Sequence, residues 1–229
     1  MKKSHMASIL TFLLLVPATL YLGTRLPGRS YYITSTLIII ELMIPFFLAY
    51  EGRRPQAREL VLIAVMAAAA IASRVAIPLP HFKPVFAVII LSGVVFGPEA
   101  GFMVGAITAF ASNFFYGQGS FTPWQMMAFG AGGMLAGFVF QKKGLPRKPW
   151  IIAAFGFLTV VLWIGPLLDC SHIFLIMSKI SWEAVLAVLL AGFYANISQA
   201  ICTVITLLLF GKPILEKLDR VRIKYGMTN

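Results

Sequence analysis

Three short polar segments between long apolar runs hold most of the side chains that could bind an organic molecule. The first is 78–84, the second is 113–125, and the third begins at Asp169. Aromatic rings combined with a few amides and one or two charges suit a neutral, largely flat ligand. The expected substrate-binding residues are His81, Phe82, Lys83, Asn113, Tyr116, Gln118, Phe121, Trp124, Gln125 and Asp169.

Some of the aromatic residues have a simpler explanation, because Tyr and Trp collect at headgroup depth in membrane proteins. We expect Trp150 and Trp182 to be anchors of this kind. The second segment is different, because Asn113 and Gln125 stand at the ends of apolar runs, where an amide needs a hydrogen-bonding partner. Ligand contact is therefore the favoured reading of that segment.

Catalytic chemistry finds no support in the sequence. The chain has no H-E-x-x-H metal helix, no G-x-S-x-G nucleophile elbow and no aspartate-rich pair. The run from Gly211 to Pro213 lacks the residues of a phosphate-binding loop, so the chain is not expected to hydrolyse ATP itself. We predict no catalytic residue, no metal site and no cofactor. Cys170 and Cys202 are read as packing residues.

Composition places the elements that carry these segments in a membrane. Of 229 residues, 59% are hydrophobic and 12% charged, and the mean hydropathy is +0.88. A soluble domain has roughly twice that charged fraction. The net charge of +11 comes from short basic clusters between apolar runs, which indicates membrane loops and not a nucleic-acid interface.

Apolar runs of suitable length predict an all-α integral membrane protein with eight spans. Lys2 and Lys3 precede the first run without an A-x-A cleavage site, so we expect a retained span and not a signal peptide. Gly165-Pro166 is expected to kink the seventh span. The predicted spans are 7–22, 31–50, 60–77, 85–96, 100–115, 124–140, 150–168 and 182–210.

The basic residues predict the orientation of these spans. With the N-terminus in the cytoplasm, most of the 19 Lys and Arg residues fall on the cytoplasmic side. The positive-inside rule therefore favours eight spans with both termini in the cytoplasm. The three polar segments then lie on the outer side of the membrane.

A stripe of small residues runs along the third predicted span. Ala64, Ala68, Ala72 and Ala76 are spaced four apart, which puts them on one face of a helix. Small residues let a second helix approach closely, and in lipid helix association depends on such packing. The stripe could serve packing inside the chain or contact with a partner, and the sequence leaves both open.

Charged and amide groups inside the spans are few. Glu41 lies near the middle of the second span, where an intramembrane carboxylate is a functional candidate by default. A packing contact and a proton site are equally compatible with it. Asn196 and Gln199 lie on the eighth span and are expected to hydrogen-bond between helices.

The region from about Arg58 to Tyr225 resembles the S components of energy-coupling factor (ECF) transporters, the vitamin-binding membrane subunits of an ABC-type importer class. The resemblance rests on the alanine-striped helix, the short span ending at Gly97-Pro98-Glu99, and the glycine-marked span that follows. The run 119–127, Gly-Ser-Phe-Thr-Pro-Trp-Gln-Met-Met, is the most specific local match. The basic tail from Lys212 also resembles the end of such proteins.

The resemblance implies a six-helix core (57–229) preceded by two extra transmembrane helices (1–56). It implies that the ligand sits near the outer face and that the alanine face docks on a transmembrane coupling subunit driven by two separate ATPases. It also implies that the whole subunit rotates in the membrane of a bacterial cell, carrying the ligand inward. No enzymatic activity is expected.

The 119–127 loop looks most like that of the cobalamin S components, so the resemblance implies a cobalamin substrate. Glycines at Gly117 and Gly119 could open the loop for a bulky ligand. Riboflavin, another vitamin or a queuosine precursor remain alternatives. So does a stand-alone proton-coupled carrier that uses Glu41 and Asp169 as relay groups, although no inverted repeat supports it.

Overall fold

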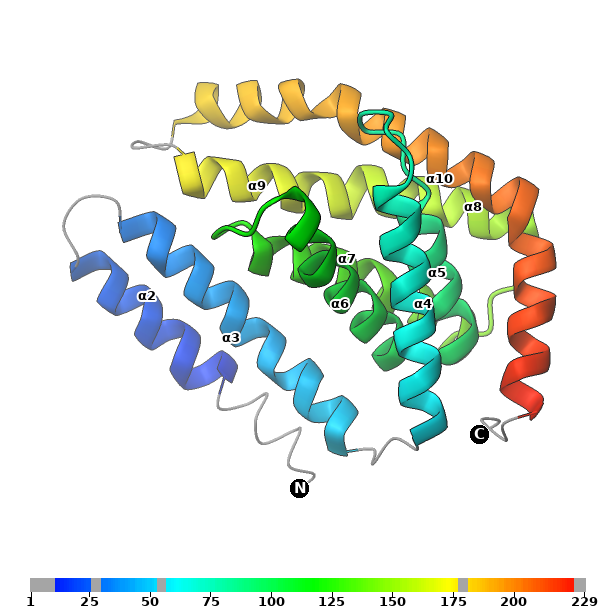
Figure 1. Cartoon of the computed structure of the whole chain (residues 1–229). Coiled ribbons are helices and arrows are strands. Elements are labelled where there is room, and N and C mark those ends of the chain that lie inside the picture. Colours follow the sequence, from blue (N-terminus) through cyan, green and yellow to red (C-terminus); the bar gives the residue numbers. More distant parts are fainter. Residues whose placement is uncertain (1–10, 26–29, 53–56, 177–180, 225–229) are drawn as a thin grey trace.

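The computed structural model describes residues 11–25, 30–52, 57–176 and 181–224, and the regular secondary structure of these residues is all helical (Figure 1). Short π-helical turns interrupt or precede several helices. The helices are α2 (Val16–Arg25), α3 (Ser30–Gly52), α4 (Ala57–Val75), α5 (Val85–Phe96), α6 (Pro98–Tyr116), α7 (Thr122–Gly137), α8 (Pro149–Thr159), α9 (Gly165–Ile176) and α10 (Trp182–Lys224). The π turns are η1 (Thr11–Leu15), η2 (Phe138–Lys142) and η3 (Val160–Ile164).

The length and surface of these helices suit a membrane. Ile33–Gly52, Pro149–Phe174 and Trp182–Lys224 are long and apolar enough to cross a bilayer, and Val85–Phe96 is a shorter apolar helix. Large apolar side chains cover the outside, with Phe114 and Leu162 each 68% exposed. The expectation of an all-α membrane protein is confirmed. The eight-span count, the cytoplasmic termini and the division at residue 57 stay predictions.

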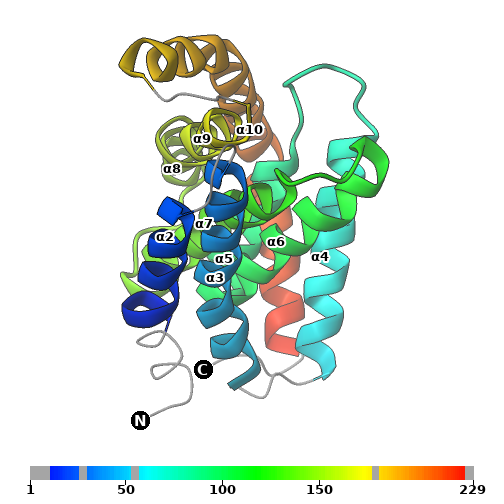
Figure 2. The same cartoon turned by 90° about the vertical axis from the view of Figure 1, so that its left-hand side faces the viewer.

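The N-terminal pair of helices lies to one side of the bundle (Figures 1 and 2). In the described part of this pair, α3 packs on the later helices: Met43 joins a small core cluster with Phe102 and Ala106 of α6. The ring of Phe47 meets that of Phe102 edge-on, with 5.9 Å between centroids. The described residues 11–52 thus meet the later helices through contacts of α3 with α6, α7 and α9.

The centre of the bundle is held by close approach of α5, α6 and α7. A Cβ on Gly101 would lie 2.4 Å from the carbonyl oxygen of Gly133, and a Cβ on Gly93 would lie 2.0 Å from the same oxygen. Such distances are far inside van der Waals contact, so only glycine permits this packing. Gly97, at φ 97°, makes the turn from α5 into α6, as the Gly97-Pro98 pair predicts.

Two long helical segments cover one side of this centre. The kink predicted at Gly165-Pro166 stays a prediction; the structure has the π turn η3 directly before Gly165, where α9 begins. Pro166 has no N–H to donate to the preceding turn, which favours an irregular helix here. The last helix, α10, is 43 residues long and changes direction before its C-terminal end (Figure 1).

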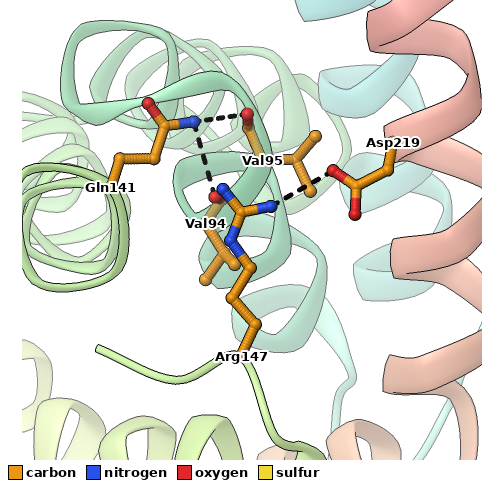
Figure 3. Close-up of polar contacts among 5 residues, drawn as sticks. All are labelled: Val94, Val95, Gln141, Arg147 and Asp219. Carbon is orange, nitrogen blue, oxygen red and sulfur yellow. Dashed lines mark hydrogen bonds and ion pairs between the residues drawn. The ribbon is translucent and has the colours of Figure 1, made fainter. Parts of the chain in front are cut away.

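Polar contacts tie the end of α5 to the chain that follows α7 (Figure 3). Gln141 donates through Nε2 to the carbonyl oxygens of Val94 and Val95, two of the last carbonyls of α5. Arg147 pairs with Asp219 of α10 at 3.2 Å. These contacts lie at one end of the bundle. The candidate site lies at the other end, beside the connection between α4 and α5.

Candidate substrate-binding site

A cavity of about 440 Å³ lies where α4 ends, α5 begins and α6 ends, with α7, α9 and α10 completing its wall. The 76–84 connection, which stands at the top of Figures 1 and 2, borders it. Its volume falls within the range of small-molecule sites, ~300–1,000 Å³. Its polar lining residues are Arg74, His81, Lys83, Tyr116, Asn196 and Gln199, and its aromatic ones include Phe86 and Phe129.

Arg74 enters the cavity from the last turn of α4. Its Nη1 donates to Asn113 Oδ1 at 3.2 Å and to the hydroxyl of Ser112, both on α6. The guanidinium carbon lies 5.0 Å from the ring centre of Tyr116 and 5.3 Å from that of Phe129. Two cation–π contacts and two neutral hydrogen-bond acceptors hold this charge in place.

Lys83 uses its charge to hold the α4–α5 connection. Its Nζ donates to the carbonyl oxygens of Arg74 (2.8 Å) and Ile77 (3.0 Å) and to the hydroxyl of Tyr116 (2.7 Å). An ammonium has three donors, so this set uses them all. Gln199 of α10 donates to the carbonyl oxygen of Lys83. Lys83 therefore fixes the wall of the cavity, and its own donors are occupied.

On the opposite wall, Asn196 is oriented by Asp169. Asn196 Nδ2 donates to Asp169 Oδ2 at 2.9 Å, and Asp169 is 8% exposed. A Cβ on Gly192 would lie 2.4 Å from the Asp169 carboxylate, so the absence of a side chain there makes room for it. With one N–H given to Asp169, Asn196 keeps its carbonyl and its second N–H for other partners.

Aromatic rings and aliphatic side chains form the remaining walls. Phe86 of α5 and Phe129 of α7 meet edge-on, with ring centres 4.8 Å apart. His81 lies in the connection at φ 54°, a left-handed conformation that is uncommon outside glycine. The rings and hydrogen-bonding groups of the lining can hold a flat organic molecule by apolar contact and by a few directed bonds.

The structure divides the residues predicted to bind a ligand into two groups. His81, Lys83 and Tyr116 line the cavity. Asn113 is fully buried beside it and donates to Thr122 Oγ1 (3.1 Å) and Gln125 Oε1 (2.8 Å) while accepting from Arg74. Its place is behind Arg74. The residues outside the lining are Phe82, Asn113, Gln118, Phe121, Trp124, Gln125 and Asp169.

Some of the residues outside the lining make contacts within their own loop or between helices. Gln118 donates to the carbonyl oxygen of Phe110 (2.9 Å) and accepts from Thr122 (2.9 Å). Trp124 is 4% exposed and stacks on Phe174 of α9 with ring centres 5.6 Å apart. Trp124 thus packs between α7 and α9.

Sequence reasoning missed Arg74 as a site residue, although a signal was present. The buried face of α4 runs through Ile63, Met66, Ala67 and Ala70, and Arg74 follows at the next helical interval. A basic residue that continues the buried face of an apolar helix faces the interior of the bundle. Asn196, expected to hydrogen-bond between helices, does so with Asp169 of α9, whereas Gln199 bonds the carbonyl oxygen of Lys83 in the α4–α5 connection; both also line the cavity.

The alanine stripe lies on the other side of α4. Ala64, Ala68, Ala72 and Ala76 are all exposed, whereas Ala67 is 2% and Ala70 0% exposed on the buried face. The stripe therefore makes no tight packing contact within the described part of the chain. One helix thus presents Arg74 to the cavity and a row of alanines to the outside.

Glu41 lies away from the cavity, between the two N-terminal helices. The hydroxyl of Thr19 on α2 donates to its Oε1, and its Oε2 is buried without a hydrogen-bond partner among the described residues. The Cys170 and Cys202 thiols are free. The described residues contain no group of His, Cys, Asp and Glu side chains arranged to hold a metal ion.

The chain matches a protein-family model over most of its length. Residues 55–216 match the family described as ECF-type riboflavin transporter, S component. The match spans the region from α4 into α10 and therefore includes every element of the cavity wall. Comparisons with curated proteins and with solved structures gave no match.

Proposed function

The chain belongs to the family of ECF-type riboflavin transporter S components, and we propose that the cavity beside Arg74 binds the vitamin that it transports. The family makes the chain a multi-pass membrane subunit of an importer and places it in no enzyme class. The observation that carries the proposal is the cavity itself. It is apolar over most of its wall and has a few directed polar groups, contributed by α4, the α4–α5 connection, α6 and α10, as small-molecule sites do.

The size of the cavity favours a flat, flavin-sized vitamin. A volume of about 440 Å³ with the rings of Phe86, Tyr116 and Phe129 on its walls accommodates a fused ring system by stacking. The family description supports riboflavin as the first candidate. Cobalamin, the substrate that the 119–127 loop favours, is several times larger, and it would require the 76–84 connection to move outward.

Ligand retention by purified protein tests this proposal. The protein is produced with equimolar riboflavin and cobalamin, washed in detergent, and its absorbance spectrum recorded. We expect a yellow flavin spectrum at about one molecule per chain. A red-pink cobalamin spectrum would instead assign the larger vitamin. No retained ligand at micromolar concentrations would contradict a high-affinity binding subunit.

Two alanines on α10 offer a matched test of the location. Ala195 lines the cavity, whereas Ala191, one turn earlier, is exposed. Ala195→Trp should fill the cavity and abolish ligand retention, and Ala191→Trp should leave it unchanged. Equal retention by both variants would place the ligand elsewhere.

The exposed alanine stripe supports a second part of the proposal, that α4 docks on a transmembrane coupling subunit driven by two ATPases. Four small, exposed side chains on one helix face let another helix come close in lipid without rearrangement of large side chains. The exposure of all four residues argues against the alternative of packing within the chain.

A further inference from the structure

The guanidinium of Arg74 lines the cavity with only part of its donors in use. Its Nη1 donates to the hydroxyl of Ser112 and to Asn113 Oδ1. Its Nε and Nη2 have no acceptor in the described part of the chain. These two nitrogens share one edge of the guanidinium plane, and their parallel N–H bonds fit a pair of adjacent acceptors. Arg74 therefore has a complete donor pair to offer a ligand.

Lys83, the other Lys or Arg residue of the lining, has no such capacity. Its Nζ donates to the carbonyl oxygens of Arg74 and Ile77 and to the hydroxyl of Tyr116. An ammonium has three donors, and these contacts use all of them. Of the two cations, Arg74 is thus the one that can give hydrogen bonds to a ligand.

The surroundings of Arg74 stabilise its charge without a carboxylate. The guanidinium carbon lies 5.0 Å from the ring centre of Tyr116 and 5.3 Å from that of Phe129, and each ring attracts the cation through its π face. Ser112 and Asn113 add two neutral acceptors. Because the charge has these partners, it needs no anionic ligand. An uncharged vitamin such as riboflavin can therefore occupy the cavity beside it.

A flat ring with a carbonyl oxygen beside an unprotonated ring nitrogen is a neutral partner for such a donor pair. Arginine reads guanine in DNA in this way, with two N–H bonds directed at the O6 and N7 atoms of the base. The flavin ring system has two edges of the same chemistry, one formed by N1 and the C2 carbonyl and the other by N5 and the C4 carbonyl. A guanidinium edge can therefore recognise a flavin although the flavin carries no charge.

We propose that Arg74 determines the specificity of the site, with its Nε and Nη2 donating to the carbonyl oxygen and the adjacent ring nitrogen of a neutral fused-ring vitamin. The inference rests on the proposed function, because it takes this cavity as the substrate site, and it names the group of the vitamin that the protein reads. The site then selects a flavin over a flat molecule of similar size without such an acceptor pair. The positive charge also lies against an edge that gains electron density on reduction, so the bound flavin should be easier to reduce.

Two analogues that differ from riboflavin in one ring atom test the proposal without any change to the protein. In 1-deazariboflavin a C–H group replaces N1, and in 5-deazariboflavin it replaces N5. Dissociation constants of the full-length protein in detergent are measured by calorimetry for the three flavins. We expect riboflavin to bind about 10- to 100-fold more tightly than at least one analogue, because that analogue loses a hydrogen bond to a charged donor. Equal binding of all three flavins would overturn the proposal.

Variants assign this selectivity to Arg74. Arg74→Gln should weaken riboflavin binding about 10- to 100-fold and bring the three dissociation constants close together. Arg220→Gln, at an exposed position near the end of α10, removes the same charge elsewhere and should change nothing. The midpoint potential of bound riboflavin, measured by reductive titration, should be lower in Arg74→Gln than in the wild type, a shift that a merely structural role of Arg74 does not produce. Selectivity and potential that both survive Arg74→Gln would contradict the proposal.

The outcomes separate this inference from the proposed function. Tight and equal binding of all three flavins, insensitive to Arg74→Gln, would refute the role of Arg74 and leave the cavity as the flavin site. No binding of any of the three flavins would refute the flavin site itself, and the role of Arg74 with it.

Discussion

Replacing Ala68 by leucine, with the same change at Ala70 as the control, tests the role of the alanine stripe. The two residues are two positions apart on α4 but lie on different faces. Ala68 is exposed, and Ala70 is 0% exposed within the main core cluster. The substitution adds the same three carbon atoms at both positions, so any difference reports the environment alone.

The expected magnitudes differ for the two variants. At Ala70 the extra atoms enter a close-packed interior, which costs about 1–3 kcal/mol in free energy of unfolding. At Ala68 they extend from the surface, where substitutions change that free energy by roughly 0.5 kcal/mol or less. Ala68→Leu should therefore keep the stability and ligand affinity of the wild type. It should lose vitamin uptake, because the larger side chain separates α4 from the docked helix of the coupling subunit.

The assay combines thermal unfolding and ligand titration in detergent with uptake in cells that contain the coupling subunit and both ATPases. The double variant with Ala72→Leu should lose uptake more completely. If Ala68→Leu lowers stability or ligand affinity as much as Ala70→Leu does, the stripe serves packing within the chain and not docking on a partner. If the double variant transports normally, the stripe is not the docking face.

Three further substitutions test the supports of the site and fold. Asn113→Ala removes one of the two acceptors of Arg74 and two donated bonds from a fully buried position, so the free energy of unfolding should fall by about 1–3 kcal/mol and ligand titration should show weaker binding. Unchanged affinity would show that Arg74 holds its position without Asn113. Trp124→Ala empties a packed position beside Phe174 and should cost about 3–5 kcal/mol, while the ligand stoichiometry of the folded fraction stays at one. A folded variant without any ligand would make Trp124 part of the site after all. Arg147→Ala breaks a partly exposed ion pair with Asp219 and should lower the free energy of unfolding, measured by denaturation, by less than about 1 kcal/mol. A larger loss would show that this pair fixes α10.

The fold was predictable from the sequence where apolar runs and turn residues coincide. The predicted span 85–96 has the same bounds as α5, because Pro84 and Gly97-Pro98 enclose an apolar run in which Ser92 is the one polar residue. The long helix α10 was harder. Its apolar part ends near Phe210, but the helix continues to Lys224, since Lys, Glu, Leu and Arg all favour helix whether or not the segment lies in lipid.

The candidate site was predictable only in part, because the same residue types serve a ligand and a loop. Gln118 hydrogen-bonds within its own loop, and Asn113 supports Arg74 from behind. Their polarity indicates that each needs partners, but it does not say which ones. The sequence also predicted Asp169, at the start of the third polar segment, as a ligand contact, whereas in the structure Asn196 lines the cavity and donates to Asp169.

Uptake of labelled vitamin in cells that produce this chain with or without the coupling subunit and the two ATPases tests the central claim most directly. A substrate-binding subunit of an ECF importer should accumulate the vitamin only when all partners are present, and Ala195→Trp should abolish that accumulation. Equal uptake by the chain alone would contradict the account and would favour a stand-alone carrier.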